Sequence, residues 1–535
     1  MNISSFATAV LALCTFALPS AFAHEEDKAT PPEVLGTVTF PNSCSKPVKA
    51  KLSRGIKLLH SFWYSEAEAT FLSVLADDPS CSIAQWGLAS ILMSNPLAGI
   101  GATPKNAERA QAAIEAARAS PAKTERERDY VEAVAAYYDD FSKHLERERQ
   151  LARSAAYEKL AAKYPKDDEA QIFNALYLTS AQSPSDSSYA MALRAAGILE
   201  RQFKKHPDHP GIAHYLIHSY DYPPIAAQGV PAARKYAKIA PSAPHALHMP
   251  SHIFTRVGYW TDSAATNARS FVSAVKGNEP GEAWHASDYR VYALLQLARD
   301  ADAQKTYDQA RTVTNIDPNR PYYPRASIPA RLALERGDWK QAATLDPVQS
   351  KFSYTDALVY FARGLGAARS GDPAAAEKEI ETLRKIHDEL AEARNSYWAS
   401  EVEVSGLAIR SWVDLARGDS ALAEQRMRQA ADIEDAHEKG PITPGRMLPA
   451  RELLGDMLME LGRPADALKE YEKTRKREPN RFRGVYGAAL AAEKSGDDAT
   501  ARRYYRQLLD MAGKGDARPE LDHARAFIAT SVRKS

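Results

Sequence analysis

A 34-residue repeat near the C-terminus is the feature that most restricts how this chain can fold. Four small or aromatic positions recur, so that Gly455, Gly462, Ala467 and Tyr471 are followed 34 residues later by Ala489, Gly496, Ala501 and Tyr505. A period of this length accommodates two helices and their turns. Glycine suits the point where the chain reverses, and alanine suits the closest approach of the paired helices. The repeat therefore predicts stacked helical hairpins.

Weaker copies of the pattern occur elsewhere. An N-terminal copy contains Gly55, Leu58, Ala67, Phe71 and Pro79, and two central copies contain Gly337-Asp338-Trp339 with Ala342 and Gly371-Asp372-Pro373 with Ala376. These residues and spacings resemble the tetratricopeptide repeat family. The resemblance is strong over residues 455–510, good over 50–95 and 330–385, and degraded between 100 and 200.

The resemblance implies an all-α solenoid, a right-handed superhelix of antiparallel helix pairs whose first helices line a concave groove that binds partners. Proline-rich breaks at 317–321 and 440–445 are candidate joints. The expected organisation is a signal peptide (1–23), an extended segment (24–48), degraded hairpins (49–205), histidine-rich central hairpins (206–315), further hairpins (316–440) and C-terminal repeats (441–535).

The N-terminus resembles a cleavable secretory signal. An apolar run over residues 6–18 precedes Ala21-Phe22-Ala23, although no lysine or arginine stands before the run. We expect cleavage near Ala23 and export to a bacterial periplasm or exterior. An oxidising compartment would permit a disulfide between Cys44 and Cys81, which the sequence leaves open.

Charge and hydropathy exclude two classes of partner. With 69 Lys and Arg against 68 Asp and Glu, the net charge of +1 lacks the excess that a nucleic-acid-binding protein needs. No segment after the N-terminal run approaches the roughly 18 apolar residues that span a bilayer, so no membrane insertion is expected.

Histidines are concentrated in the central hairpins. Eight of the 14 fall within 80 residues, namely His206, His209, His214, His218, His245, His248, His252 and His285. Residues 211–221 read as a helix, and at 100° per residue His214, His218 and Asp221 lie within about 60° of one another. Such a polar stripe on one helix face indicates a site.

Counting back from the small packing residue aligns the next two hairpins with each other. Offsets of 18, 15 and 11 residues from Ser263 give His245, His248 and His252, and the same offsets from Ala303 give His285, Asp288 and Tyr292. By resemblance to the family, these positions face the groove. Pro250 leaves one alternative open, because it could break the helix and move His245 and His248 into a loop.

The sequence thus predicts one or two transition-metal ions (Zn, Cu, Fe or Mn) in the groove, since neutral imidazoles and carboxylates suit these metals. The candidate ligands are His214, His218, Asp221, His245, His248, His252, His285 and Asp288. Some would orient other ligands instead of binding metal, and Asp221 or Asp288 is the candidate general base if the protein is catalytic. His206 and His209 are expected in an exposed turn.

A second interpretation from another class stays open. Repeat proteins of this type commonly bind peptides, so the chain could be a metal-free scaffold of the cell envelope that holds a peptide, protein or small molecule in its groove. The sequence does not decide between the metal site and the metal-free scaffold. It also does not show whether the protein is an enzyme.

Overall fold

The computed structural model describes residues 32–347, 349–440 and 442–532, and within these ranges the regular structure is entirely helical. The predicted signal peptide at 1–23 lies outside them. Short 3₁₀ helices occupy Lys46–Val48, Phe141–Lys143 and Ala226–Gly229. The α-helices of the first half are α1 (Lys49–His60), α2 (Tyr64–Asp77), α3 (Ser82–Leu92), α4 (Pro104–Ala119), α5 (Glu125–Ala135), α6 (Glu146–Lys163), α7 (Asp168–Ala181), α8 (Ala190–Lys205), α9 (Pro210–Ser219), α10 (Val230–Ile239), α11 (Pro244–His248), α12 (Pro250–Arg256) and α13 (Trp260–Lys276).

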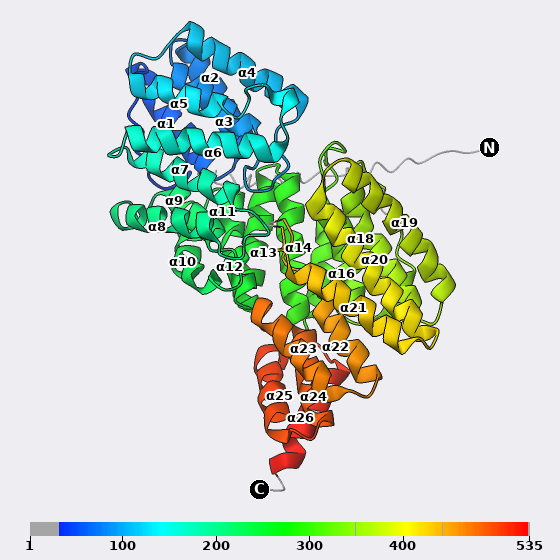
Figure 1. The fold of residues 1–535 in the computed structure, drawn as a ribbon. Helices are drawn as coiled ribbons and strands as arrows, with labels where there is room; N and C mark the ends of the chain where they lie inside the picture. The colour runs from blue at the N-terminus through cyan, green and yellow to red at the C-terminus, as the bar shows by residue number, and fades with distance from the viewer. Residues whose placement is uncertain (1–31, 348, 441, 533–535) are drawn as a thin grey trace, which may run out of the picture. The chain divides into compact units, whose positions relative to one another are not determined.

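The second half continues in the same manner (Figure 1). Its helices are α14 (Pro280–Gln296), α15 (Asp300–Arg311), α16 (Tyr323–Leu334), α17 (Trp339–Ala343), α18 (Ser353–Arg369), α19 (Pro373–Glu392), α20 (Ser396–Ala416), α21 (Ser420–Asp435), α22 (Ala450–Glu460), α23 (Pro464–Arg477), α24 (Phe482–Lys494), α25 (Asp498–Ala512) and α26 (Pro519–Val532). None of these described helices is long and apolar enough to cross a membrane.

Each helix packs mainly on its neighbours in the sequence. For example, α22, α23 and α24 contact one another in series, as do α1, α2 and α3. A hairpin cannot bury its apolar face alone, so successive hairpins share their cores. The predicted all-α array of stacked helix pairs is confirmed.

The repeat has a physical basis in glycine–aromatic contacts. A Cβ atom on Gly55 or Gly87 would lie 2.7 or 2.6 Å from the ring of Phe71, which sits between them. Gly455 and Gly487 meet the ring of Tyr471 in the same way, at 2.7 and 2.5 Å. Only glycine lets the backbone of each first helix approach the aromatic residue of the second helix so closely.

Contacts between distant segments tie the hairpins together. From Val34 onward the chain forms one unit. Helix α1 contacts α9, and α14 contacts α24, although the paired helices are far apart in the sequence. The helices α9, α11, α12, α13 and α14 lie together (Figure 1), and they carry most of the clustered histidines.

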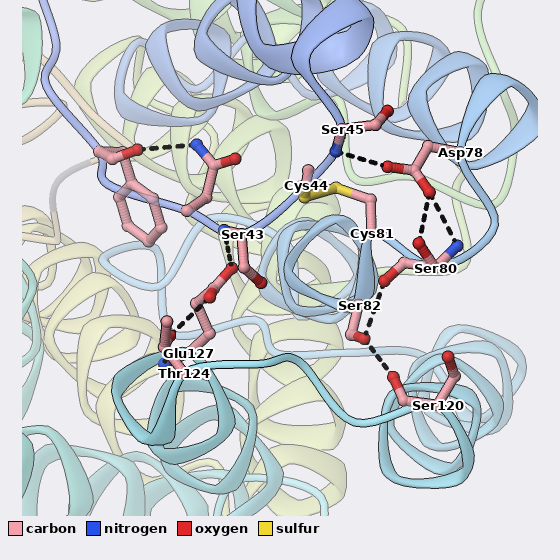
Figure 2. The surroundings of a disulfide bond; sticks show 12 residues. Ser43, Cys44, Ser45, Asp78, Ser80, Cys81, Ser82, Ser120, Thr124 and Glu127 are labelled. Carbon is pink, nitrogen blue, oxygen red and sulfur yellow. Dashed lines mark hydrogen bonds between the residues drawn. A yellow bond between two sulfur atoms is a disulfide. The ribbon is translucent and has the colours of Figure 1, made fainter.

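A disulfide joins Cys44 to Cys81 and fastens the extended N-terminal segment to α3. Figure 2 shows the polar contacts around it: the Ser45 amide donates to Asp78 Oδ2 over 2.8 Å, and the Ser43 amide donates to Glu127 Oε1 over 2.9 Å. The structure therefore pairs the two cysteines whose bonding the sequence left open.

Candidate metal centre

Six histidines from four helices form one continuous cluster. Helix α9 supplies His214 and His218, α11 supplies His245 and His248, α12 supplies His252, and α14 supplies His285. Neighbouring ring centroids lie 4.4 to 5.9 Å apart along the run from His214 through His245 and His248 to His285. Five of the rings are buried and His285 is partly buried.

Pro250 does not remove residues from this cluster. It begins α12 directly after α11, and Met249 between them keeps helical dihedrals of −52° and −36°. Proline is tolerated at the first turn of a helix, where its missing N–H has no partner to lose. His245, His248 and His252 therefore stay on helical backbone, and the loop alternative does not occur.

The first group of three is His214, His218 and His245. One ring nitrogen of each lies within 4.8 Å of one from both others. His214 Nδ1 donates to the backbone carbonyl of His60 over 2.7 Å, and His245 Nδ1 donates to Glu282 Oε2 over 3.1 Å. The Nε2 atoms of all three rings are buried without a hydrogen-bond partner among the described residues. The two Nδ1 contacts fix the tautomers so that bare Nε2 lone pairs remain.

The second group of three is His248, His252 and His285, whose donor atoms also lie within 4.8 Å of one another. His248 Nδ1 donates to Asn267 Oδ1 over 2.7 Å, and His252 Nδ1 donates to Asp221 Oδ2 over 2.9 Å. Asn267 has its amide oriented by donating Nδ2–H to the Ser263 carbonyl over 2.8 Å.

These contacts leave both facing Nε2 atoms without hydrogen. His248 Nε2 lies 3.0 Å from His252 Nε2, so two lone pairs point at each other. Lone pairs at this distance repel unless a cation sits between or beside them. A proton shared as a hydrogen bond, or a metal ion beside both atoms, would relieve this repulsion.

Burial disfavours the protonated form of five histidines in the cluster, namely His214, His218, His248, His252 and His285. It lowers the pKa of His214, His218 and His248 well below the ordinary value, with neighbouring histidines acting in the same direction. The pKa of His252 is also lowered by burial, despite Asp221, and that of His285 falls to about 3. Neutral imidazoles are the form that binds metal, and a bound proton is disfavoured.

The two predicted aspartates lie outside both groups. Asp221 orients a ligand candidate: its Oδ2 accepts from His252, and its Oδ1 accepts from Arg256 Nε over 2.7 Å. Asp288 is fully buried against Arg331, with 3.2 Å between Oδ1 and Nε. Neither aspartate belongs to a group of three, although Asp221 accepts from His252 of the second group. Their roles as ligand or general base stay predictions.

Three neighbours of the cluster were not predicted from the sequence. Glu282 orients His245, Asn267 orients His248, and the His60 carbonyl orients His214. Glu282 precedes His285 by three residues on α14, so the shared helix face was a usable signal. The contact of His60 with His214 joins residues 154 apart, and the repeat spacing carries no signal for it.

A third group, His60, Glu169 and His209, brings its donor atoms equally close but satisfies them internally. Glu169 accepts from His60 Nε2 over 3.0 Å and from His209 Nε2 over 2.9 Å. His60 Nδ1 pairs with the Tyr215 hydroxyl, and His209 Nδ1 accepts from the Ile212 amide. All four ring nitrogens are occupied, so this group is a buried hydrogen-bond network.

The expectation of an exposed turn was wrong for His209, which is 3% exposed because it caps α9 and contacts Glu169. His206 is partly buried and lies 2.8 Å from Asp168.

Aromatic rings contact both groups of three histidines. Phe62 lies 4.4 Å from His214 and 5.6 Å from His245, measured between ring centroids. Tyr289 lies 4.7 Å from His248, 5.0 Å from His252 and 5.2 Å from His285. These apolar faces exclude water from the rings and hold their orientations.

Comparisons with known proteins supply little beyond the chain's own contacts. No family model and no curated relative matches. Among solved structures, the chain is similar to the APC/C heterotetramer Cut9–Hcn1, with 13% identity, 90% of this chain and 95% of that chain covered, and a TM-score of 0.33. It is also similar to a human IFIT1 dimer with m7Gppp-AAAA, with 11% identity, coverage of 79% and 90%, and a TM-score of 0.36. The class of the protein, an all-α array of stacked helix pairs, rests on the packing described above.

Proposed function

We propose that this protein binds two transition-metal ions, one in each group of three histidines between α9, α11, α12 and α14. The observation that carries the proposal is the 3.0 Å approach of the His248 and His252 Nε2 lone pairs, in a site where burial disfavours protonation. The three buried, unpartnered Nε2 atoms of His214, His218 and His245 support it independently.

The donor set narrows the choice among the four metals considered. Both groups offer imidazole nitrogens, and neither contains a carboxylate or a thiolate. Imidazole sites suit copper and zinc, whereas manganese prefers carboxylates and iron commonly takes one carboxylate with two histidines. Copper or zinc is therefore the proposed occupant, and copper is favoured by intrinsic affinity.

The chain's residues have distinct tasks in this centre. The His60 carbonyl, Glu282, Asn267 and Asp221 fix which nitrogen is bare in four of the six imidazoles, those of His214, His245, His248 and His252. Phe62 and Tyr289 pack against the rings. Bound metal would supply Lewis acidity or one-electron chemistry. The site thus suits either a metal-dependent enzyme or a metal carrier.

Export to a periplasm or exterior is part of the proposal. It is supported by the signal-like N-terminal sequence and by the Cys44–Cys81 disulfide, a bond that persists in oxidising compartments.

Elemental analysis of untagged protein tests the proposal. We expect about two equivalents of copper or zinc in the wild type, and loss of both in a variant carrying His214→Ala and His248→Ala. His206→Ala is the matched control, because this partly buried histidine in the same region lies outside both groups. Folded wild-type protein that takes up no metal, yet binds a peptide, would favour the metal-free scaffold instead.

A further inference from the structure

A cavity of about 500 Å³ reaches the histidine cluster from one side. Its lining includes His218 and Asp221. Its walls come from the start of α6, the end of α7, the turn between α19 and α20, and residues 438–440 and 442. A volume of this size accommodates a small organic molecule.

The carboxylates lining this cavity are all neutralised by cations. Glu146 pairs with Arg149 at 3.0 Å, Asp221 with Arg256 at 2.7 Å, and Glu438 with Arg477 at 3.1 Å. None of these three arginines lines the cavity itself. The carboxylates of the lining are therefore paired with arginines that lie outside the cavity.

The cations lining the cavity are not neutralised in this way. Arg147, Arg394 and Lys439 form no ion pair with any carboxylate in the described part of the chain. Arg147 donates to the Ser180 carbonyl over 3.3 Å, and Lys439 Nζ donates to the Thr443 carbonyl over 2.9 Å. Burial lowers the pKa of Lys439 to about 8, which leaves it mainly protonated at pH 7. The lining thus holds three cations without a directly bonded carboxylate, and Asp221, Glu438 and Glu478 act on Lys439 only over longer distances.

Aromatic side chains form one part of the wall. Tyr222, Tyr397 and Trp398 all line the cavity. Trp398 is held by stacking on Tyr354, with ring centroids 4.5 Å apart and planes at 19°. A rigid aromatic wall beside unpaired cations suits a ligand that has an apolar body and one anionic group.

We propose that this cavity binds a small aromatic carboxylate and presents it to the His218 side of the metal centre. The presentation to metal rests on the function proposed above, whereas the recognition of the anion rests on Lys439, Arg394 and the aromatic wall alone.

Calorimetric titration with benzoate tests this proposal, with benzamide as the neutral probe of the same shape and inorganic phosphate as the anion without an apolar body. The full-length, untagged protein is measured as purified and after chelation. Loss of a charge-assisted contact costs about a factor of 10, so we expect benzoate to bind at least about tenfold tighter than either other probe.

Variants assign the charge recognition to residues. Lys439→Gln should weaken benzoate binding by about fivefold to tenfold, and Arg394→Gln, at an exposed turn where folding is not at risk, by about twofold to fivefold. Arg201→Gln, an exposed arginine on α8 outside the cavity, is the matched control and should leave benzoate affinity unchanged.

The outcomes separate this proposal from the metal proposal. Metal-loaded protein that binds benzoate no better than benzamide or phosphate overturns the anion site only. Metal-free protein that still selects benzoate, and loses that selection in both variants, supports the anion site while the metal proposal fails. Benzoate binding that vanishes on chelation, or that ignores both substitutions, assigns the anion to the metal and overturns the role of Lys439 and Arg394.

Discussion

Two buried histidine networks lie side by side in this molecule, and they differ in one respect. In the His60–Glu169–His209 network every ring nitrogen has a protein partner, and the carboxylate sits between the two imidazoles. In the six-histidine cluster the carboxylates and the amide accept from Nδ1 atoms instead. The Nε2 atoms of His214, His218 and His245 have no hydrogen-bond partner among the described residues, and those of His248 and His252 face each other at 3.0 Å.

This difference distinguishes a hydrogen-bonded network from the proposed metal site, whereas the distances between donor atoms do not. Both arrangements place three donor atoms within 4.8 Å of one another. Buried polar groups are normally paired, so a set of inward-facing lone pairs is the part of the structure that calls for a ligand. The groups that accept from the Nδ1 atoms would then orient the imidazoles, as the hydrogen-bond partners of metal-bound histidines usually do.

The largest expected effect comes from removing ligands of the cluster. His252→Ala should abolish binding at the second group and halve the metal content, because a two-imidazole remainder loses several kcal/mol of about 10 to 16 kcal/mol of binding free energy. His209→Ala should leave metal content unchanged. Metal analysis after dialysis distinguishes the two networks, and equal losses in both variants would contradict the distinction.

The pH dependence of unfolding should come next in size. Five cluster histidines have a lowered pKa in the folded protein, namely His214, His218, His248, His252 and His285. Below the unfolded value near 6.5 the unfolded chain therefore binds more protons. Metal-free protein should hold its full stability above pH 6.5 and lose up to about 1.4 kcal/mol per pH unit for each such histidine below it.

Urea unfolding of metal-free protein between pH 7.5 and pH 5 measures this loss. His285→Phe, which removes one histidine whose pKa is lowered to about 3, should make the loss shallower. An unfolding midpoint that does not change over this range would show that the imidazoles are not buried as neutral groups.

Glu169→Ala should act on stability alone. It leaves the Nε2 atoms of His60 and His209 buried without their acceptor, at a cost of about 1 to 3 kcal/mol for each. We expect a free energy of unfolding lower by roughly 3 kcal/mol and unaltered metal stoichiometry. A variant that kept its stability but lost metal would reverse the roles assigned to the two networks.

The smallest effect is expected from substituting a residue that orients a proposed ligand without binding metal itself. Asp221→Asn keeps the shape of the side chain but removes the negative charge behind His252. Loss of such a partner usually weakens metal affinity by about 10-fold to 100-fold. Competition with a chelator of known affinity measures this, and Asp288→Asn, whose carboxylate pairs with Arg331 instead, should give a smaller change.

Much of the fold follows from the sequence because its repeat is local. The glycines and the aromatic residue between them, such as Gly455, Tyr471 and Gly487, lie within one repeat length, and their spacing determines how neighbouring hairpins pack. The same local counting places His248 and His285 on facing helices. Six of the eight ligand candidates accordingly lie in the two groups.

The remainder depends on contacts that no local period encodes. Asp221 forms an ion pair with Arg256, and Asp288 forms one with Arg331. Each arginine comes from a helix in a later hairpin. His60 reaches His214 and Glu169 because α1 packs on α9, across more than 100 residues. The sequence therefore indicated which histidines share a face, but it could not show which of them already have partners.

Anomalous diffraction from crystals of untagged protein, recorded at the absorption edge of the bound metal, tests the central claim most directly. We predict two peaks, one beside the Nε2 atoms of His214, His218 and His245 and one beside those of His248 and His252, with metal–nitrogen distances of about 2.0 Å. A peak at His60, Glu169 and His209, or no peak at the six-histidine cluster in protein soaked with copper and zinc, would contradict the account.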